Sequence, residues 1–554
     1  ALVSKTILEH RYALLYNDGP LTQPAISKKG ISAELFAESL SSRPILLIGD
    51  VGSGKSMFIK YLRRVEASEI FKKSFTIYID LGSKAALISD LKTFILDEIY
   101  KIFSDVYSID LEEKQFVRGV YNGELLKFAK GIYSELLNID PNAYKLKELE
   151  LLSQKLSSKS SHLKACFESI TKSWKKQIVL FFDNVDQRDT EIQDQAFLIA
   201  NEITQNWPAT VFLTIRPTTF YKSKKDGALS GYHPKAFTIA PPRVDDVLIR
   251  RIDFAIKICS GQVNLSKFNS TLGVNLVTLN QFLEILKFSF ENNLELKEFI
   301  DNICYGNIRL AIEYLTTLIG SSHINTSKIL EYDNNNRTQN EGRYIISLHE
   351  FIRAIIYKDH HHFYPESTSI INMFEVSQND PKEHFLICFL LDYFVRYSTL
   401  AQSEGFVETK GIVDFLQNIG YNYPQIEFAF FKTINKNLIE CDGRISFNFG
   451  DEFPKYLRIT SIGAYHIKKI IYKFTYIDAI IIDVPILDEK IRARIKDVFS
   501  ITDRLSRTTD FINYLNQQWE SIPVNVKGFN WKPVSDEVLN DISRVNQKRL
   551  SLNK

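Results

Sequence analysis

The chain has few cysteines, and none lies close to another. Its 554 residues include five cysteines and no Cys-x-x-Cys pair. This wide spacing argues against a zinc site or a disulfide framework and is typical of a protein from a reducing compartment. The five are Cys166, Cys259, Cys304, Cys388 and Cys441.

Long apolar runs are also missing. No stretch approaches the ~20 residues that a membrane-spanning helix needs, and the strongest run, 479–485, contains Asp483 and Pro485. The first residues carry several charges and lack the apolar core of a signal peptide. We therefore expect a cytoplasmic protein with no membrane partner.

Neither charge sign is in clear excess. The chain has 68 Lys and Arg against 66 Asp and Glu, a formal net charge of +2. Whole-chain charge therefore gives no argument for nucleic acid, and any basic surface must be local. The charged fraction of 24% and the hydrophobic fraction of 45% are ordinary for a globular protein. A chain of this length is expected to form several domains.

One complete motif stands out near the N-terminus. Residues 49–56 read GDVGSGKS, which fits the P-loop pattern G-x-x-x-x-G-K-[S/T]; the apolar run before it, 44–48, suits a buried strand, and the run after it, 57–62, suits a helix. The glycines let backbone N–H groups surround phosphates, Lys55 reaches the β- and γ-phosphates, and Ser56 binds Mg²⁺. The motif predicts ATP and Mg²⁺ as ligands; the alternative is a glycine-rich turn between core elements. The predicted binding residues are Gly49, Asp50, Val51, Gly52, Ser53, Gly54, Lys55 and Ser56.

A second nucleotide motif lies far downstream. Residues 178–183 are five apolar residues followed by Asp183, the Walker B pattern of a buried strand that delivers a carboxylate to Mg²⁺. Asn184 follows and can orient a water but cannot accept its proton. Asp186 is the nearest acid. It acts either as the base or as a helix cap or salt-bridge partner for Arg188.

The next predicted strand, 210–216, ends at Pro217. In a parallel sheet its carboxyl end lies beside Asp183. Thr214 is a candidate contact for the γ-phosphate or the attacking water, and Arg216 for the γ-phosphate. The alternative for Arg216 is a surface residue at a strand end. A further strand is predicted over 235–239, before Pro241 and Pro242.

Helices are predicted from there to about residue 325. They include the segment 302–311, NICYGNIRLA. Gly306 is suited to end one helix and Asn307 to cap the next, which would present Arg309 from a first helical turn.

Together, the P-loop, the Walker B strand, the strand near Thr214 and the Gly-Asn-x-Arg-x-Ala segment resemble the AAA+ ATPases. The resemblance extends over roughly residues 40–325, and is nearest to the origin-recognition/initiator branch and to nucleotide-switch ATPases of the STAND type. It implies that Arg309 is the sensor 2 arginine, which contacts the γ-phosphate, and that Thr214 is the sensor 1 residue.

The chain departs from the AAA+ pattern in three ways. Asn184 stands where many of these ATPases have a glutamate, which implies slow hydrolysis. A helical insertion separates the P-loop from the Walker B strand. The arginine finger is unassigned, with Arg216, Arg243 and Arg250 as candidates.

The insertion, about 84–172, follows a predicted strand at 75–80. Apolar residues recur at helical spacing in two stretches, and we interpret both stripes as packed helical core rather than as a partner groove. The first contains Leu87, Leu91, Phe94, Ile95, Ile99 and Ile102. The second contains Leu125, Leu126, Phe128, Ile132, Leu136 and Leu137.

The C-terminal half resembles a winged-helix domain. The pattern predicts helices over 383–400, 409–416 and 424–437, a hairpin across 445–447 and 456–460, and a last helix over 461–467. In a DNA-binding winged helix the third helix enters the major groove. This helix has few positive charges, so DNA contact and protein packing both remain open. The candidate exposed residues are Gln425, Glu427, Lys432, Asn435 and Lys436 on the helix and Arg444, Lys455 and Arg458 on the wing.

Two smaller features complete the pattern. Consecutive histidines 360–362 are interpreted as a surface loop, because metal-binding pairs usually lie at i, i+4 on a helix. Trp519 and Trp531 are expected to be packing anchors in the last, helical region.

The sequence thus predicts an α/β fold: a P-loop NTPase parallel sheet with a helical insertion, an α-helical lid, a winged-helix domain and C-terminal helices. The expected domains are an N-terminal segment (1–40), the ATPase core (41–240), the lid (241–325), a connecting region (326–382), the winged helix (383–475) and a helical region (476–554).

The first functional hypothesis is an AAA+ ATPase whose nucleotide state controls homo-oligomer assembly and engagement of DNA or a protein partner. The alternative is a STAND-type signalling switch, as in antiphage or innate defence, with slow hydrolysis and no direct DNA binding. A third interpretation is a scaffold that binds nucleotide only for stability.

Overall fold

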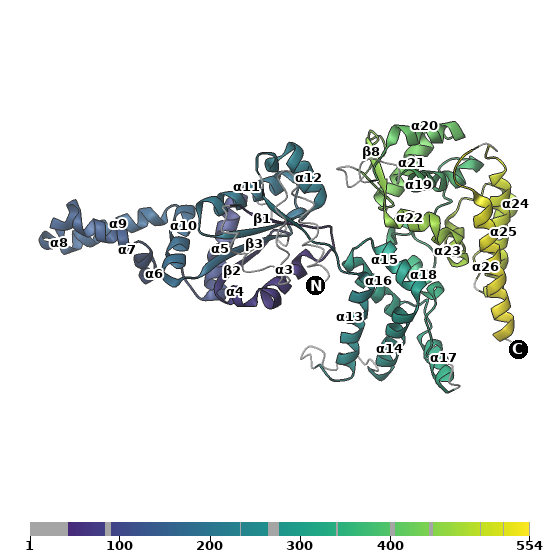
Figure 1. Cartoon of the computed structure of the whole chain (residues 1–554), viewed down its shortest axis with the longest axis horizontal. Coiled ribbons are helices and arrows are strands. Elements are labelled where there is room, and N and C mark those ends of the chain that lie inside the picture. Colours follow the sequence, from purple (N-terminus) through teal and green to yellow (C-terminus); the bar gives the residue numbers. More distant parts are fainter. Residues whose placement is uncertain are drawn as a thin grey trace, which may run out of the picture. The chain divides into compact units, whose positions relative to one another are not determined.

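A computed structural model describes residues 43–82, 90–232, 234–263, 276–338, 342–398, 405–441, 447–498, 500–523 and 526–552. The chain forms two compact units, Ala1–Pro241 and Pro242–Lys554 (Figure 1). The predicted segment 1–40 lies outside the described residues, as do Leu87 and Arg444.

The first unit is built on a five-stranded sheet in which every pairing is parallel. Its order is β2-β3-β4-β1-β5, so β4 lies between the strand before the P-loop and the strand ending in Asp183. All five predicted strands are found, which confirms the predicted α/β class with a parallel sheet. They are β1 (Ile45–Ile48), β2 (Ser74–Asp80), β3 (Gln177–Asp183), β4 (Thr210–Ile215) and β5 (Lys235–Thr238).

Helices cover both faces of this sheet, as the unbroken apolar runs of its strands require. In β1 the side chains alternate between two cores: Leu46 and Ile48 join one, and Ile45 and Leu47 join the other. Helices α5, α10, α11 and α12 contribute to the first core, and α3 and α4 to the second. They are α3 (Lys55–Tyr61), α4 (Ser68–Lys72), α5 (Leu91–Tyr107), α10 (Lys159–Ser169), α11 (Thr190–Asn206) and α12 (Pro217–Asp226).

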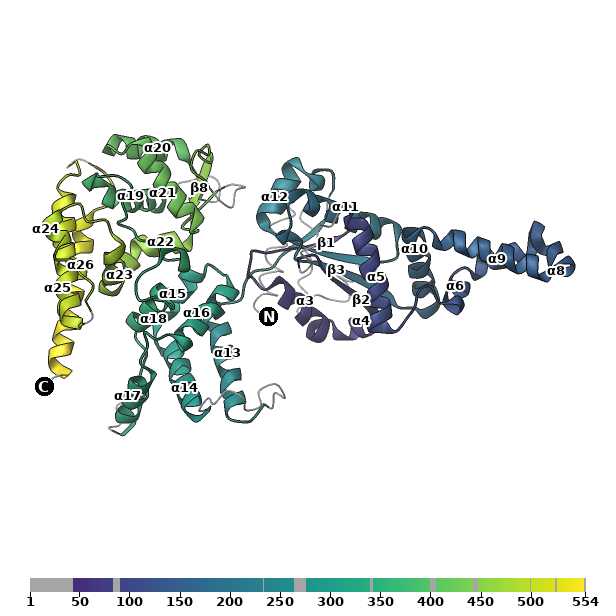
Figure 2. The same ribbon diagram turned by 180° about the vertical axis from the view of Figure 1, so that it is seen from behind.

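The helical insertion continues beyond the sheet as a projecting arm, seen in both views (Figures 1 and 2). It is formed by α6 (Lys114–Val120), α7 (Asn122–Lys130), α8 (Leu136–Ile139) and α9 (Pro141–Leu156). The first predicted stripe is core where it is described, since Leu91, Ile95 and Ile99 are buried. For the second stripe the core prediction is largely wrong: no residue of α7 or α8 is buried, Leu126, Ile132 and Leu137 are exposed, and Leu125 packs only partly buried against a small core. Helical spacing shows that residues share a face but not that a partner covers it.

The second unit has one continuous hydrophobic core, which runs from Val244 to Ile542. The predicted lid, connecting region, winged helix and C-terminal helices therefore share a single interior. Its helices are α13 (Val244–Cys259), α14 (Leu276–Asn292), α15 (Leu294–Cys304), α16 (Ile308–Gly320), α17 (Thr326–Thr338), α18 (Leu348–Tyr357), α19 (Leu386–Tyr397), α20 (Thr409–Ile419), α21 (Tyr423–Asn435), α22 (Ser461–Lys468), α23 (Phe474–Ile480), α24 (Glu489–Arg492), α25 (Ile501–Trp519) and α26 (Trp531–Leu552).

A three-stranded antiparallel sheet lies in this unit with order β6-β8-β7. Its strands are β6 (Val407–Glu408), β7 (Ile439–Cys441) and β8 (Tyr456–Ile459). β8 pairs with β7, directly after α21, and Phe447, the described residue of the strand predicted at 445–447, lies outside any strand. Residues 445 and 446 fall outside the described part.

Aromatic packing anchors the C-terminal helices. Trp531 is 1% exposed, and its ring centroid lies 5.4 Å from that of Phe374. Trp519 packs edge-on against Phe385 at 4.8 Å, so both predicted anchors are confirmed. Within the described residues, no helix combines the length and apolar character needed to cross a membrane.

Candidate functional site

The carboxyl ends of β1, β2, β3 and β4 meet at one edge of the sheet. The registers pair Ile48 with Ile215 and Asp80 with Asp183. The loop after β1 therefore lies beside the acidic ends of β2 and β3, which is where open α/β sheets place their ligands.

The loop 49–56 wraps tightly, as a phosphate cradle requires. Gly52 and Gly54 have φ of 75° and 93°, a region that favours glycine. A Cβ at Gly49 would lie 2.7 Å from Ser53 Oγ. Ser53 is 2% exposed, and its Oγ has no hydrogen-bond partner in the described part of the chain. A buried hydroxyl without a partner at this point suits an incoming oxygen acceptor.

Lys55 folds its ammonium group back over this loop. Its Nζ donates to the carbonyl oxygens of Gly49 (2.6 Å) and Asp50 (3.2 Å), and to Asp186 Oδ2 (3.2 Å). Only 7% of Lys55 is exposed. The cation is thus buried at the mouth of the loop, where it can exchange these oxygens for those of a phosphate.

Asp183 is fully buried at the end of β3 and is held by hydrogen-bond donors. Thr214 Oγ1 donates to Oδ1 at 2.9 Å, the backbone N–H of Asn184 donates to the same oxygen at 2.9 Å, and Tyr78 donates to Oδ2. No lysine, arginine or histidine among the described residues forms an ion pair with Asp183. A buried carboxylate with this donor set and no cation fits a divalent metal ion.

Tyr78, on β2, joins the two predicted metal ligands. Its hydroxyl interacts with both Asp183 and the Ser56 side chain. Burial, and then the Asp183 carboxylate, raise the pKa of Tyr78 well above its ordinary value. The phenol therefore stays protonated and donates its proton to Asp183. Sequence reasoning missed Tyr78; the available signal was the predicted strand at 75–80, whose end lies beside Asp183.

Asn184 adopts a left-handed conformation with φ of 57°. Its side-chain amide donates to Asp80 Oδ1 at 2.8 Å, and its backbone N–H also lies 3.1 Å from Thr214 Oγ1. Asp80, a second residue that sequence reasoning missed, thus orients Asn184. In this arrangement the Asn184 side-chain nitrogen is engaged by a carboxylate.

Asp186 lies between two cations. Its Oδ2 accepts from Lys55 Nζ at 3.2 Å and from Arg216 Nε at 3.1 Å. The Asp186 side chain is 6% exposed and that of Arg216 is 24% exposed. Arg216 therefore lies at the site, as predicted, and the ion pairs of Asp186 are with Lys55 and Arg216. The predicted candidate partner Arg188 instead donates from Nε to the carbonyl oxygen of Leu81.

These ion pairs give a first prediction. Asp186→Asn keeps the shape of the side chain but leaves two cations without their counter-charge, so we expect the free energy of unfolding to fall by about 3 kcal/mol. Urea unfolding of the ligand-free protein measures this. Glu191→Gln, the same change on an exposed side chain, is the control. Equal unfolding energies for Asp186→Asn and the parent protein would contradict the counter-ion role.

The other predicted site residues lie in the second unit. Arg309 is exposed in the first turn of α16, and the Asn307 side chain caps that helix through the Leu310 N–H at 3.1 Å. The predicted local presentation of Arg309 is therefore confirmed. Arg243 pairs with Asp245 at 2.8 Å. The histidine loop 360–362 is exposed, as predicted.

Helix α21 does not present the free polar face that was predicted for it. Gln425 is fully buried and donates to Asp380 and Glu383. Lys432 pairs with Glu375 at 3.0 Å, and Lys436 donates to the carbonyl oxygen of Pro365 at 2.6 Å. The prediction of exposed side chains is wrong for these residues, because segment 365–383 packs over them. Asn435 hydrogen-bonds to the backbone of Phe447, and Glu427 accepts from the backbone N–H of Gly450. On the predicted wing, Arg458 pairs with Glu440.

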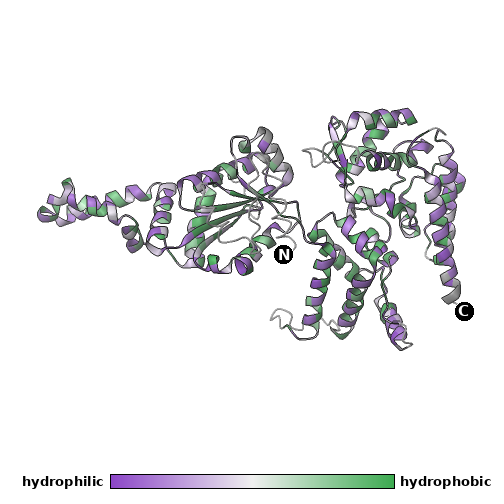
Figure 3. Cartoon of the chain, in the orientation of Figure 1, coloured by the Kyte–Doolittle hydropathy of each residue, from purple (hydrophilic) through white to green (hydrophobic). Residues whose placement is uncertain are grey.

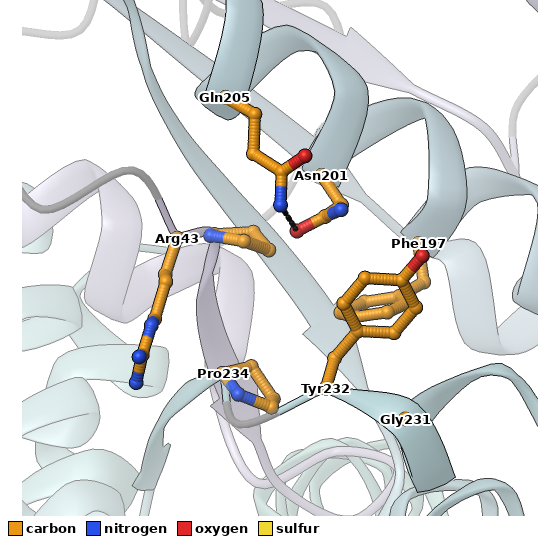
Figure 4. Close-up of a pocket in the computed structure, with 8 residues that line it drawn as sticks. Arg43, Phe197, Asn201, Gln205, Gly231, Tyr232 and Pro234 are labelled. Carbon is orange, nitrogen blue, oxygen red and sulfur yellow. Dashed lines mark hydrogen bonds between the residues drawn. The ribbon is translucent and has the colours of Figure 1, made fainter.

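A separate cavity of about 410 Å³ lies at the opposite edge of the sheet (Figure 4). Arg43 precedes β1 and Tyr232 precedes β5, so the cavity is at the amino ends of these strands. Tyr232 packs edge-on against Phe197 at 5.5 Å, and Gln205 donates to Asn201. The parallel strands separate this cavity from the loop 49–56, so it does not belong to the site.

Comparison with known proteins identifies no family. No protein-family description matches the chain, and no curated protein does. Among solved structures, the Aeropyrum pernix ORC2 protein in its ADP form aligns with a TM-score of 0.36 and 11% identity, over 80% of this chain and 92% of that one. Cdc6p from Pyrobaculum aerophilum aligns with a TM-score of 0.28 and 12% identity, over 80% of this chain and 92% of that one. A chain of Drosophila ORC bound to DNA aligns with a TM-score of 0.27 and 12% identity, over 84% of this chain and 98% of that one.

Proposed function

We propose that the first unit binds ATP with Mg²⁺ at the loop 49–56 and hydrolyses it slowly. The observation that supports this most is the meeting of Lys55, Ser56 and Asp183 at one sheet edge, with Tyr78 in contact with both metal-ligand candidates. The orphaned Ser53 hydroxyl and the close approach at Gly49 fit a phosphate chain.

The side chains at the site have different proposed roles in binding phosphate and Mg²⁺. Lys55 and Arg216 supply positive charge that can move from Asp186 to phosphate oxygens, and Ser56 and Asp183 supply oxygen ligands for Mg²⁺. A bound Mg²⁺ neutralises charge that develops on the phosphates during transfer. Thr214 holds Asp183 in place and lies where it can also meet an attacking water.

Slow turnover follows from the neighbours of Asn184. An amide cannot accept a proton, and this one is bound to Asp80. Asp186 is the acid left to act as the base, and its Oδ2 is already engaged by Lys55 and Arg216. We therefore propose a nucleotide-controlled switch in assembly rather than a rapid motor.

We propose that the second unit makes the contacts that change when the nucleotide state changes. The order α19, α20, α21, β7, β8 and α22, with β6 between α19 and α20, supports the proposal of a winged helix there. The internal contacts of Gln425, Lys432 and Lys436 favour a packing or protein-contact role for α21 over reading of a DNA major groove. We therefore favour a second copy of the chain or another protein over DNA as the partner. The light-scattering measurement described next includes DNA as a test.

Arg309 is proposed to read the γ-phosphate, since it is exposed at the start of a capped helix. Arg309→Ala should bind ADP with an affinity within about twofold of the parent, yet lose the size change that a non-hydrolysable ATP analogue produces, because a ligand shifts an equilibrium only through differential contacts. Light scattering with each nucleotide, repeated with a DNA duplex, measures it. Arg337→Ala, an arginine of α17, is the control. A parental response in Arg309→Ala would exclude this sensor role.

A further inference from the structure

The distal arm of the first unit carries apolar side chains that the described part of the chain leaves exposed. Helices α7 and α8 have no buried residue, and α9 buries only Tyr144 and Leu152. Bands of hydrophobic colour run along these helices among polar ones (Figure 3). The exposed apolar residues are Leu126 (56%), Ile132 (86%), Leu137 (51%), Ile139 (76%), Leu146 (61%) and Leu149 (57%).

One face of α9 is occupied within the arm. Leu152 packs in a small core with Val117 and Tyr121. Glu148 pairs with Arg118, and Lys155 pairs with Glu124 at 2.6 Å. Tyr144, Glu148, Leu152 and Lys155 recur at helical spacing, so this face is the inner one.

The opposite face of α9 has no cover within the described residues. Asn142, Lys145, Leu146, Leu149, Glu150 and Ser153 are all exposed. Leu146 and Leu149 are three residues apart and form the apolar centre of this face. Lys145 and Glu150 flank them with opposite charges, and Glu150 also pairs with Lys147 of its own helix at 2.8 Å, an exposed pair that a second copy would have to share or replace.

This outer face is complementary to itself. Its residues Lys145, Leu146, Leu149 and Glu150 run lysine, leucine, leucine, glutamate, so reversing their order exchanges each charge for its opposite. A two-fold axis between residues 147 and 148 would place Leu146 against Leu149 of a second copy, and Lys145 against its Glu150. The same axis sets Asn142 opposite Ser153. A two-fold contact of this kind requires a self-complementary surface.

We propose that the outer face of α9 is a homotypic contact, in which the arms of two copies of this chain pair antiparallel. The contact from Asn142 to Ser153 is about 17 Å long at 1.5 Å per residue. Such a short interface is below the size of stable dimers, so the arms pair weakly on their own. They strengthen an assembly that a second contact between the same copies already holds.

Charge exchange tests the geometry. In the nucleotide-free full chain, Lys145→Glu or Glu150→Lys alone places like charges together twice per dimer, and we expect about tenfold weaker self-association by sedimentation velocity. The double variant Lys145→Glu with Glu150→Lys restores both pairs, so its dissociation constant returns to within about twofold of the parent's. Lys101→Glu, on the exposed side of α5, is the control and leaves it unchanged. A monomeric parent at all concentrations, unaltered single variants, or a double variant no better than the singles would overturn the proposal.

Cysteine pairing tests the orientation. A tagged Leu146→Cys chain is mixed with an untagged Leu149→Cys chain, both with Cys259→Ser because the other four cysteines are buried. The antiparallel contact predicts a mixed disulfide far in excess of the Leu146→Cys self-pair. A dominant Leu146→Cys self-pair, or no disulfide of either kind, would contradict the antiparallel contact. A different protein or a membrane would then be the partner of the apolar face. Lys55→Ala chains should pair equally well, which separates this proposal from the nucleotide proposal.

Discussion

Lys55→Ala is expected to lower the affinity for ATP by about a hundredfold, because it removes a buried cation from the mouth of the loop 49–56. The side chain contacts the carbonyl oxygens of Gly49 and Asp50, so it is already placed at the phosphate position. Isothermal titration with ATP and Mg²⁺ measures the loss.

Lys60→Ala is the matched control, because Lys60 lies on the same helix and is exposed. It should bind ATP as the parent does. Circular dichroism establishes that both variants are folded, which matters because Lys55 is also an ion-pair partner of Asp186. Parental affinity in a folded Lys55→Ala protein would show that the loop is only a glycine-rich turn.

Asp183→Asn is expected to reduce ATP turnover by about a hundredfold and ATP affinity by less than about fivefold, because the metal ligand is lost while the phosphate contacts remain. The substitution is nearly isosteric. The amide oxygen still accepts from Thr214, and the Tyr78 hydroxyl can accept from the new amide nitrogen. Phosphate release and nucleotide titration, each over a range of Mg²⁺ concentrations, separate the two effects.

Asp189→Asn provides the control for this charge change. Asp189 caps α11 through the Ile192 N–H at 3.0 Å, and asparagine caps a helix about as well. Turnover should therefore be unchanged. Parental turnover and Mg²⁺ dependence in Asp183→Asn would mean that the end of β3 does not supply the metal ligand.

The central sheet could be predicted because its inner strands β1, β3 and β4 are buried on both faces. Each reads as an apolar run bounded by polar residues, glycine or proline, and each observed strand begins and ends within one residue of the prediction. The P-loop and Asp183 follow from the same pattern, since parallel strands bring their carboxyl ends to one edge. What the pattern could not show was Tyr78, whose role depends on the register between β2 and β3.

The second unit was harder to predict because its contacts join distant segments. Lys432 and Lys436 have the spacing of an exposed basic face, and only the folded chain shows that Glu375 and Pro365 engage them. Asp478 is another residue whose contacts could not be predicted. It is fully buried and accepts from Arg504 and Arg507 at 2.7 Å, and no pattern in the neighbouring sequence indicates these partners.

Helix α18 is different, because the sequence does carry its signal. Ser347 and Glu350 form a capping box at its start, yet this stretch was predicted to be a connecting region. The helix is largely buried within the core of the second unit.

The measurement that tests the central claim most directly is the size of the parent protein with different nucleotides. Sedimentation velocity is run with Mg²⁺ and ADP, and with Mg²⁺ and a non-hydrolysable ATP analogue, beside Lys55→Ala. We predict a larger assembly with the analogue than with ADP, and no difference between the two nucleotides in Lys55→Ala. The same size in both nucleotides, with both bound, would contradict the proposal that nucleotide state controls assembly.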